Sequence, residues 1–172
     1  MEERKCRGLI IQNNPFSYAT GNGKTIASMF SEWTNENLAQ IFTSNLQPDF
    51  TICKNYYKIS DANALQSFLK RIPCGHPLYA DINTKENEKN HGKVTSKFSK
   101  GCDFLRSWMS ESSFVACLRD LMWRKSNWNN VTLYEWLDEV QPTFVFLSAG
   151  NLSVFYDMAQ FICEYKGIPL FI

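Results

Sequence analysis

The stretch RGLIIQNNPFSYATGNGKTIASMF, residues 7–30, decides the fold class of this chain. Residues 7–12 form an apolar run that ends at Asn-Asn-Pro, which predicts a buried strand entering a loop. The predicted loop spans residues 13–23, is polar and ends in Gly-Asn-Gly, and residues 24–30 then show helical apolar spacing. The order is therefore strand, polar glycine-containing loop, helix.

The rest of the chain alternates segments rich in strand-forming residues with segments of helical apolar spacing. We expect further strands at residues 37–43, at one or two places within 50–59, at 143–147 and at 168–172. We expect further helices at residues 62–70, 104–109, 114–123, 132–140 and 152–165. Ser60 and Asp61 are typical of a helix N-cap, and Gly167 is typical of a C-cap.

The predicted strands are apolar throughout and not at every second residue, which is typical of a parallel sheet that is covered on both faces. We therefore predict an α/β fold, a Rossmann-like three-layer sandwich with a mainly parallel sheet and helices on both faces. Ligands of such sheets bind at the carboxyl ends of the strands. The loops after Gln12 and after Leu147 are accordingly where a functional site is expected.

The length of 172 residues predicts a single domain, residues 1–172. Residues 71–100 show almost no apolar periodicity and are rich in Asn, Lys and Glu, which predicts a flexible insert. The last predicted strand, residues 168–172, reads as buried, and the helix that normally follows such a strand is missing. We interpret the chain as one fold unit cut off after this strand.

Composition argues against two large functional classes. Eighteen Lys and Arg residues against seventeen Asp and Glu residues give a formal charge of +1, so a nucleic-acid partner is not expected. No stretch approaches the roughly 20 apolar residues of a membrane-spanning helix, and the N-terminus lacks the apolar run of a signal peptide. The six cysteines include no C-x-x-C pair. We therefore expect a cytoplasmic protein with free thiols, without a metal site and without a cofactor.

The glycine-containing loop fits two known phosphate-binding motifs poorly. The phosphate loop of nucleoside triphosphatases ends in Gly-Lys-Thr, as here, but it needs a glycine at position 18, where this chain has Tyr18. The dinucleotide fingerprint needs a glycine where this chain has Ile26. What remains is a polar loop at a helix N-terminus, which favours an anion or a sugar hydroxyl, or else a simple turn.

Most of the chain resembles the N-terminal domain of GT-B fold glycosyltransferases, in particular bacterial members that act in surface-polysaccharide assembly. The similarity covers most of the chain except residues 71–100. The segments that carry it lie within residues 8–70 and 142–165, and it is sharpest at Asn-Gly-Lys-Thr, residues 22–25, and Ser-Ala-Gly-Asn, residues 148–151. The resemblance implies two Rossmann-like domains that face each other across a cleft. The N-terminal domain receives the acceptor, and the C-terminal domain holds the nucleotide-diphosphate sugar, commonly without a bound metal.

The resemblance implies that this chain is the acceptor-side half of a hexosyltransferase-like enzyme. Its partners would be a nucleotide-sugar donor, bound mainly by the other domain, and a glycan or a lipid-linked acceptor. The donor-binding half has no counterpart in this chain, so we expect the chain alone to be inactive. The residues that the resemblance places at the substrates are Asn14, Gly21, Asn22, Gly23, Lys24, Thr25, Ser148, Gly150 and Asn151.

The histidines, the cations near the tryptophans and the possible functions of a lone Rossmann-like domain lead to three further hypotheses. Both histidines, His76 and His91, lie in the predicted insert, so no catalytic base is assigned. Arg119, Arg124 and Lys125 lie among tryptophans, which is compatible with peripheral membrane contact or with a solvated helix face. The alternative function is a stand-alone Rossmann-like binding or interaction module, and a nucleotide hydrolase is a more distant third.

Overall fold

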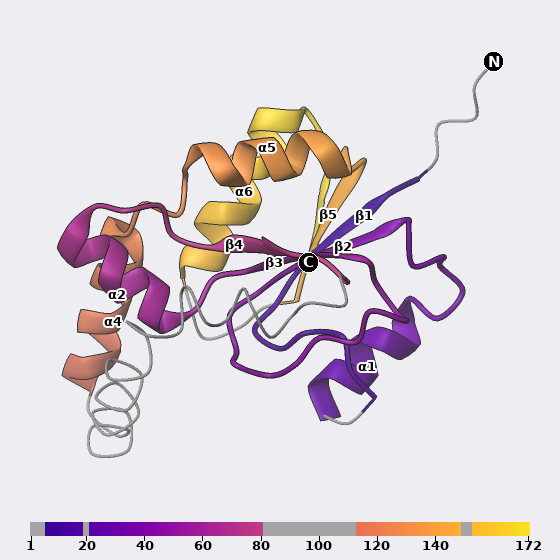
Figure 1. Ribbon diagram of the computed structural model, residues 1–172, viewed down its shortest axis with the longest axis horizontal. Coiled ribbons are helices and arrows are strands. Elements are labelled where there is room, and N and C mark those ends of the chain that lie inside the picture. Colours follow the sequence, from indigo (N-terminus) through magenta and orange to yellow (C-terminus); the bar gives the residue numbers. More distant parts are fainter. Residues whose placement is uncertain (1–5, 19–20, 81–112, 149–152) are drawn as a thin grey trace.

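The computed structural model of the protein describes residues 6–18, 21–80, 113–148 and 153–172. This part of the chain contains six strands and five helices (Figure 1). In chain order they are β1 (Gly8–Ile11), α1 (Gly21–Met29), β2 (Leu38–Phe42), β3 (Asn55–Lys58), α2 (Asp61–Lys70), β4 (His76–Leu78), α4 (Ser113–Lys125), α5 (Val131–Val140), β5 (Phe144–Leu147), α6 (Val154–Lys166) and β6 (Leu170–Phe171).

The strands form one sheet in the order β4-β3-β2-β1-β5-β6. All neighbours pair in parallel except β4, which runs antiparallel to β3. The prediction of an α/β fold with a mainly parallel sheet is thus confirmed. Because β2 and β5 lie on opposite sides of β1, the order of the strands reverses between β1 and β5.

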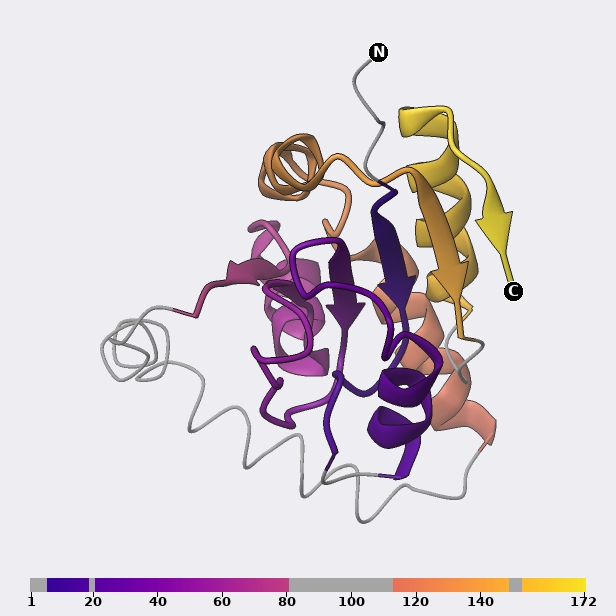
Figure 2. The same ribbon diagram turned by 90° about the vertical axis from the view of Figure 1, so that its right-hand side faces the viewer.

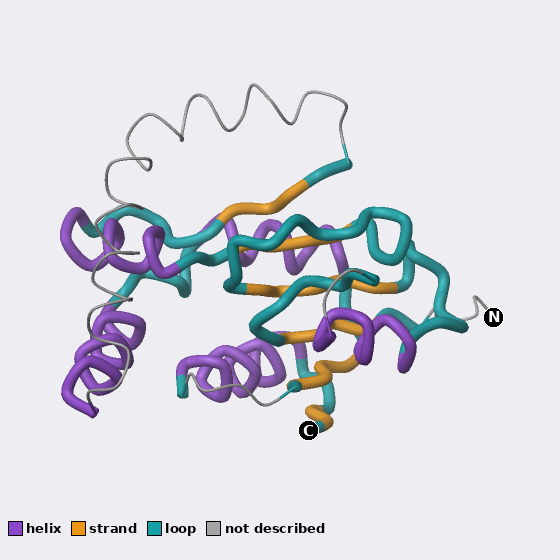
Figure 3. The backbone as a smooth tube through the Cα atoms, turned by 90° about the horizontal axis from the view of Figure 1, so that it is seen from below, coloured by secondary structure: helices purple, strands orange, loops and turns teal. Residues whose placement is uncertain are grey.

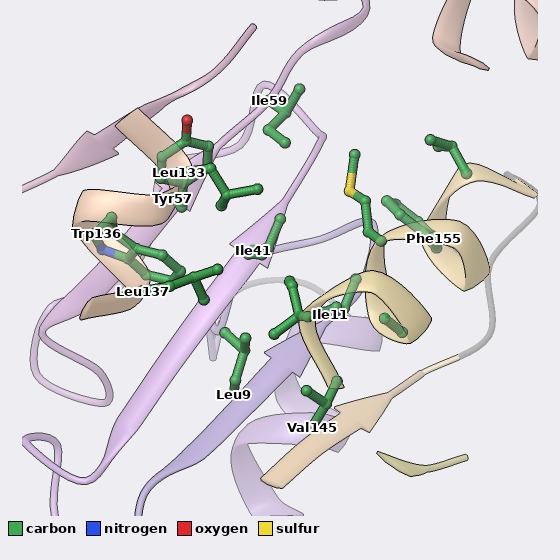
Figure 4. Packing of buried hydrophobic residues seen from close by; sticks show 14 of the residues in the cluster. Leu9, Ile11, Ile41, Tyr57, Ile59, Leu133, Trp136, Leu137, Val145 and Phe155 are labelled. Atoms are coloured by element: carbon green, nitrogen blue, oxygen red, sulfur yellow. The ribbon is translucent and has the colours of Figure 1, made fainter. Parts of the chain in front are cut away.

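The sheet has two unlike faces. On one face, which we call the helical face, Leu9, Ile11 and Val145 pack with side chains from α2, α4, α5 and α6 (Figure 4). On the other face, the α1 face, Ile10 packs with α1 and with Phe16 from the loop after β1. Figure 2 shows α1 and α6 on opposite sides of the sheet. Helices therefore cover both faces, as predicted, but very unequally.

Local signals at the helix ends behave as predicted. The Ser60 hydroxyl accepts from the backbone N–H of Asn63 at 3.1 Å, while the Asn63 side chain accepts from the Ser60 N–H, so α2 starts with a reciprocal capping box. Helix α6 ends at Gly167, whose φ of 64° is left-handed and whose N–H donates to the Cys163 carbonyl.

One expected boundary is wrong, and one alternative left open by the sequence is decided by the structure. Helix α1 begins at Gly21 and not at Lys24, so the Gly-Asn-Gly triplet forms the first helical turn and is neither a loop nor a simple turn. Packing of Ile26 and Ala27 in the core outweighs the low helix propensity of the glycines. Residues 50–59 hold one strand, because the N–H groups of Ile52 and Cys53 both turn back to the Asp49 carbonyl.

The two outermost strands also differ from expectation. Residues 71–80 of the predicted insert are described, and they contain β4, whereas residues 81–100 lie outside the described residues. Pro77 reads as a turn residue, but an edge strand tolerates proline. At the other side of the sheet, the sequence predicts a buried strand β6. Phe171 is instead 53% exposed, because β6 is the outermost strand and α6 packs on only one of its faces.

Candidate functional site

The candidate site lies at the carboxyl ends of β1, β2 and β5. The N–H of Ser148, just after β5, donates to the Ile11 carbonyl at 3.0 Å, and the N–H of Gln12 donates to the Ile41 carbonyl at 3.1 Å. The loops that leave these three strands therefore start side by side. Figure 3 shows the strands of the sheet (orange) side by side, with loops (teal) leaving their ends. This is the place where the strand order reverses, which is the usual ligand position in open α/β sheets.

The loop after β1 is fixed by two buried glutamines. Gln40, in the middle of β2, is fully buried; its Oε1 accepts from the Phe16 N–H at 2.8 Å, and its Nε2 donates to the Asn14 carbonyl at 3.1 Å. Nε2 of Gln12 donates to the same Asn14 carbonyl. Phe16 itself is completely buried on the α1 face. The backbone of residues 14–16 is therefore held from inside the core.

The same loop is also tied to the end of β2. The Asn13 carbonyl accepts from the N–H groups of Thr43, at 3.1 Å, and Ser44, at 2.9 Å. The Thr43 hydroxyl donates to Oδ1 of Asn13. The neighbouring side chain of Asn14 is partly exposed at this edge. The arrangement presents one amide side chain on a rigid backbone, which suits recognition of a hydroxyl group.

The first turn of α1 is the second part of the site. Gly21, Asn22, Lys24 and Thr25 are exposed, and Gly23 is buried. The Thr25 hydroxyl donates back to the Gly21 carbonyl at 3.1 Å. N–H groups in a first helical turn have no partner within the helix and carry the positive end of its dipole. Together with the Lys24 ammonium, this turn is suited to oxygen-rich or anionic groups.

The third predicted segment is only partly described. Ser148 is half-buried next to the end of β1, as its bond to the Ile11 carbonyl requires. Gly150 and Asn151 lie outside the described residues. The structure thus brings Ser148 and the Asn14 loop to one edge, and the chain direction places the start of α1 at that same edge.

The sequence analysis missed a polar cluster at the end of β3. Both carboxylate oxygens of Asp61 accept from the Arg119 guanidinium at 3.0 Å, and Nε1 of Trp123 donates to Asp61 at 2.8 Å. These contacts join α2 to α4. Because the partners are about sixty positions apart, no local pattern could signal the cluster.

Two of the three cations considered for membrane contact, Arg119 and Arg124, are engaged within the protein. Arg119 pairs with Asp61, and Arg124 pairs with Asp120 at 3.2 Å while also donating to Ser153. A solvated, paired helix face accounts for both. In the described part of the chain, none of the helices is long and apolar enough to cross a membrane.

The largest pKa shifts belong to core groups. Burial raises the pKa of the Cys53 and Cys74 thiols to about 12, and burial likewise raises the pKa of the Tyr56 and Tyr57 phenols. All these groups remain protonated at neutral pH, so none of them serves as a general base. His76 lies in the edge strand β4, and His91 lies outside the described residues.

The groups at this edge are suited to hydrogen bonding and to anions. Among the described residues, no group of three or more His, Cys, Asp or Glu side chains could hold a metal ion. Comparison with protein-family models, with curated proteins and with solved structures finds no match to this chain.

Proposed function

We propose that this chain is the acceptor-side half of a glycosyltransferase that moves a sugar from a nucleotide-diphosphate sugar to a glycan or lipid-linked acceptor. The observation that carries the proposal is the reversal of strand order between β1 and β5, where the polar loop after β1 is held rigidly by Gln12 and Gln40. A sheet edge of this kind offers a preformed ligand position.

The residues at this edge suit a polyhydroxylated ligand. Asn14 and Asn22 each offer an amide that both donates and accepts hydrogen bonds, as sugar hydroxyls do. Lys24 and the N–H groups of the first α1 turn complement phosphate oxygens that approach from a facing domain. The glycines leave room for this approach, since a Cβ at Gly21 would meet no atom within 4 Å.

In the proposed reaction, an acceptor hydroxyl attacks the anomeric carbon of the donor sugar, and the nucleoside diphosphate leaves with the electron pair of the broken C–O bond. The hydroxyl proton passes to a base. This chain would orient the acceptor, while a second α/β domain would hold the donor. Orientation alone is a substantial part of such catalysis, because it replaces a bimolecular encounter by a bound geometry.

A nuclear magnetic resonance titration of the ¹⁵N-labelled chain tests the proposal. We expect a panel of bacterial-type oligosaccharides and octyl glucoside to shift the amides of residues 13–17, 21–25 and 148. The double variant Asn22→Ala, Lys24→Ala should abolish the response. The matched control is Asn35→Ala, Lys54→Ala, which removes the same two residue types before β2 and β3, at the opposite edge of the sheet.

Two results would contradict the proposal. One is the absence of a response at these amides with every member of the panel. The other is tight binding of magnesium-ATP at the first turn of α1, which would favour a nucleotide hydrolase.

One observation favours the alternative of a binding or interaction module. The edge strand and its continuation leave Leu170, Phe171 and Ile172 exposed by 37%, 53% and 73%. An exposed apolar strand edge is a surface to which another chain can add. The alternative expects Phe171→Glu to change the sedimentation behaviour of the chain, whereas the transferase proposal expects it to leave glycan binding unchanged.

A further inference from the structure

Gln40 is an unusual residue for its position. It lies in the middle of β2, between Ala39 and Ile41, and its side chain is completely excluded from solvent. Strands buried on both faces normally consist of Val, Ile and Leu, because a buried amide costs free energy unless all its hydrogen bonds are made. A position that breaks this rule calls for a specific partner.

Both ends of the Gln40 amide bond to the loop after β1. Oε1 accepts from the Phe16 N–H at 2.8 Å, and Nε2 donates to the Asn14 carbonyl at 3.1 Å. Nε2 of Gln12 also donates to the Asn14 carbonyl, so both lone pairs of this carbonyl oxygen are used. Two side chains, Gln40 from β2 and Gln12 from the position just after β1, therefore hold one peptide segment of three residues.

We propose that Gln40 is a positioning residue that sets the backbone of residues 14–16 from within the core and so aims the Asn14 side chain at the ligand edge. The inference rests on the proposed function in one respect, that Asn14 contacts the substrate. The part concerning the loop geometry does not depend on any ligand.

The amide chemistry of Gln40 is the specific requirement. One end of the side chain must accept a hydrogen bond and the other end must donate one, and a neutral amide does both. An isosteric methionine does neither. A glutamate does both only when it is protonated, since an ionised carboxylate cannot donate to the Asn14 carbonyl. Burial disfavours the ionised form, so the pKa of a glutamate at this position would be raised.

Amide hydrogen exchange of the whole chain tests the loop geometry without a ligand. We expect Gln40→Met to speed exchange of the Phe16 amide by about tenfold or more, since one hydrogen bond is lost. Exchange at Leu9, in the sheet, should stay slow. Gln40→Glu at about pH 5, where the buried carboxyl is protonated and can make both bonds, should leave the Phe16 amide as protected as in the wild type.

A matched control separates positioning from general stability. Ser67 is also fully buried, and its hydroxyl donates to the Ile72 carbonyl at 2.6 Å, far along the chain from the loop. Ser67→Ala should lower the urea midpoint and leave exchange at Phe16 unchanged. If Gln40→Met does not fold, Gln40→Glu at about pH 5 still tests the inference, because it should keep the Phe16 amide protected.

The outcomes distinguish this inference from the proposed function. A Phe16 amide that stays protected in Gln40→Met, or one that loses its protection in Gln40→Glu at about pH 5, overturns the inference. Loss of protection in Gln40→Met, when no glycan of the panel binds the wild type, supports the loop geometry and contradicts the proposed function. Equal glycan binding by the wild type and Gln40→Met overturns the positioning role and leaves the proposed function standing.

Discussion

The helical face and the α1 face of the sheet both exclude solvent, but they do so with different parts of the chain. Side chains of four helices cover the helical face, among them the fully buried Trp123, Leu137 and Phe155. The α1 face has one helix, and loop residues complete it: Phe16 from the loop after β1 and Cys53 from the turn before β3.

Because of this difference, the loop after β1 depends on the packing of the α1 face and not on that of the helical face. Phe16 packs edge-to-face against Phe30, with ring centroids 6.3 Å apart, and it lies two residues after Asn14. A change in the packing of the α1 face therefore moves the site loop. Among the described residues, none of that loop packs on the helical face, so this face stabilises the sheet without holding the loop after β1.

The largest expected effect separates the two faces directly. Phe16→Ala and Phe155→Ala each remove a fully buried ring, and each should lower the free energy of unfolding by about 3–5 kcal/mol, measured by urea denaturation. Only Phe16→Ala should also shift the amide resonances of Asn14 and Lys24. Equal shifts in both variants would show that the faces are not independent.

A smaller loss of stability is expected at the turn into β4. Gly75 has a φ of 97°, and a Cβ there would lie 2.5 Å from Tyr57 and 2.8 Å from Ile59 on the helical face. Gly75→Ala should cost about 2–4 kcal/mol, from left-handed strain and overpacking together. Gly167→Ala is the control: its φ is 64° in open space, so it should cost about 1–2 kcal/mol. Equal losses would mean that the contact with Tyr57 is relieved without cost.

The ion pair between α2 and α4 should have a moderate effect. Asp61→Asn weakens the paired bonds from Arg119, and both side chains are about one-third exposed, so solvent screens the interaction. We expect a loss of about 1–2 kcal/mol, which shrinks in high salt. The exposed pair Lys54–Glu36 is the control, and Glu36→Gln should change stability by less than about 0.5 kcal/mol. A loss that is independent of salt would contradict the electrostatic explanation.

The smallest effect concerns one buried thiol on each face. Burial raises the pKa of Cys53 and Cys74 to about 12, from 9.0 for a solvent-exposed thiol. Above about pH 9 the unfolded chain releases these protons and the folded chain keeps them, so stability declines as pH rises. Urea midpoints should be level between pH 7 and pH 8 and should fall by pH 10. Cys53→Ala and Cys74→Ala should each reduce that decline, and a midpoint that rises with pH would refute it.

The main strands could be predicted because their apolar content is local information. Residues 7–12, 37–43 and 143–147 each contain the observed strand, and Ser60 and Gly167 signal the helix ends by their own chemistry. The two outermost strands were harder to predict. Strand β4 is short and contains Pro77, and the exposure of β6 depends on what packs beside it, which no local pattern encodes.

The place of the candidate site in the fold could be predicted from the sequence, but the hydrogen bonds that hold its loop could not. The general rule for parallel sheets led to the loops after β1 and β5, and Asn14 and Ser148 do lie at that edge. Gln40 was missed, although one signal was present: a lone glutamine inside the apolar run LAQIF. Its meaning depends on Phe16, twenty-four positions away, so only the structure shows that the glutamine serves the loop.

The position of β1 at the centre of the sheet has a consequence for how the chain is made. The backbone N–H of Arg7, at the start of β1, donates to the Thr143 hydroxyl across 136 residues. At about 5–20 residues per second, a ribosome takes on the order of ten seconds to synthesise that interval. During this time β1 can pair with β2, but its other edge waits for β5. A nascent chain that stalls before residue 144 therefore presents an open apolar strand, and truncations of that length should depend on chaperones or aggregate.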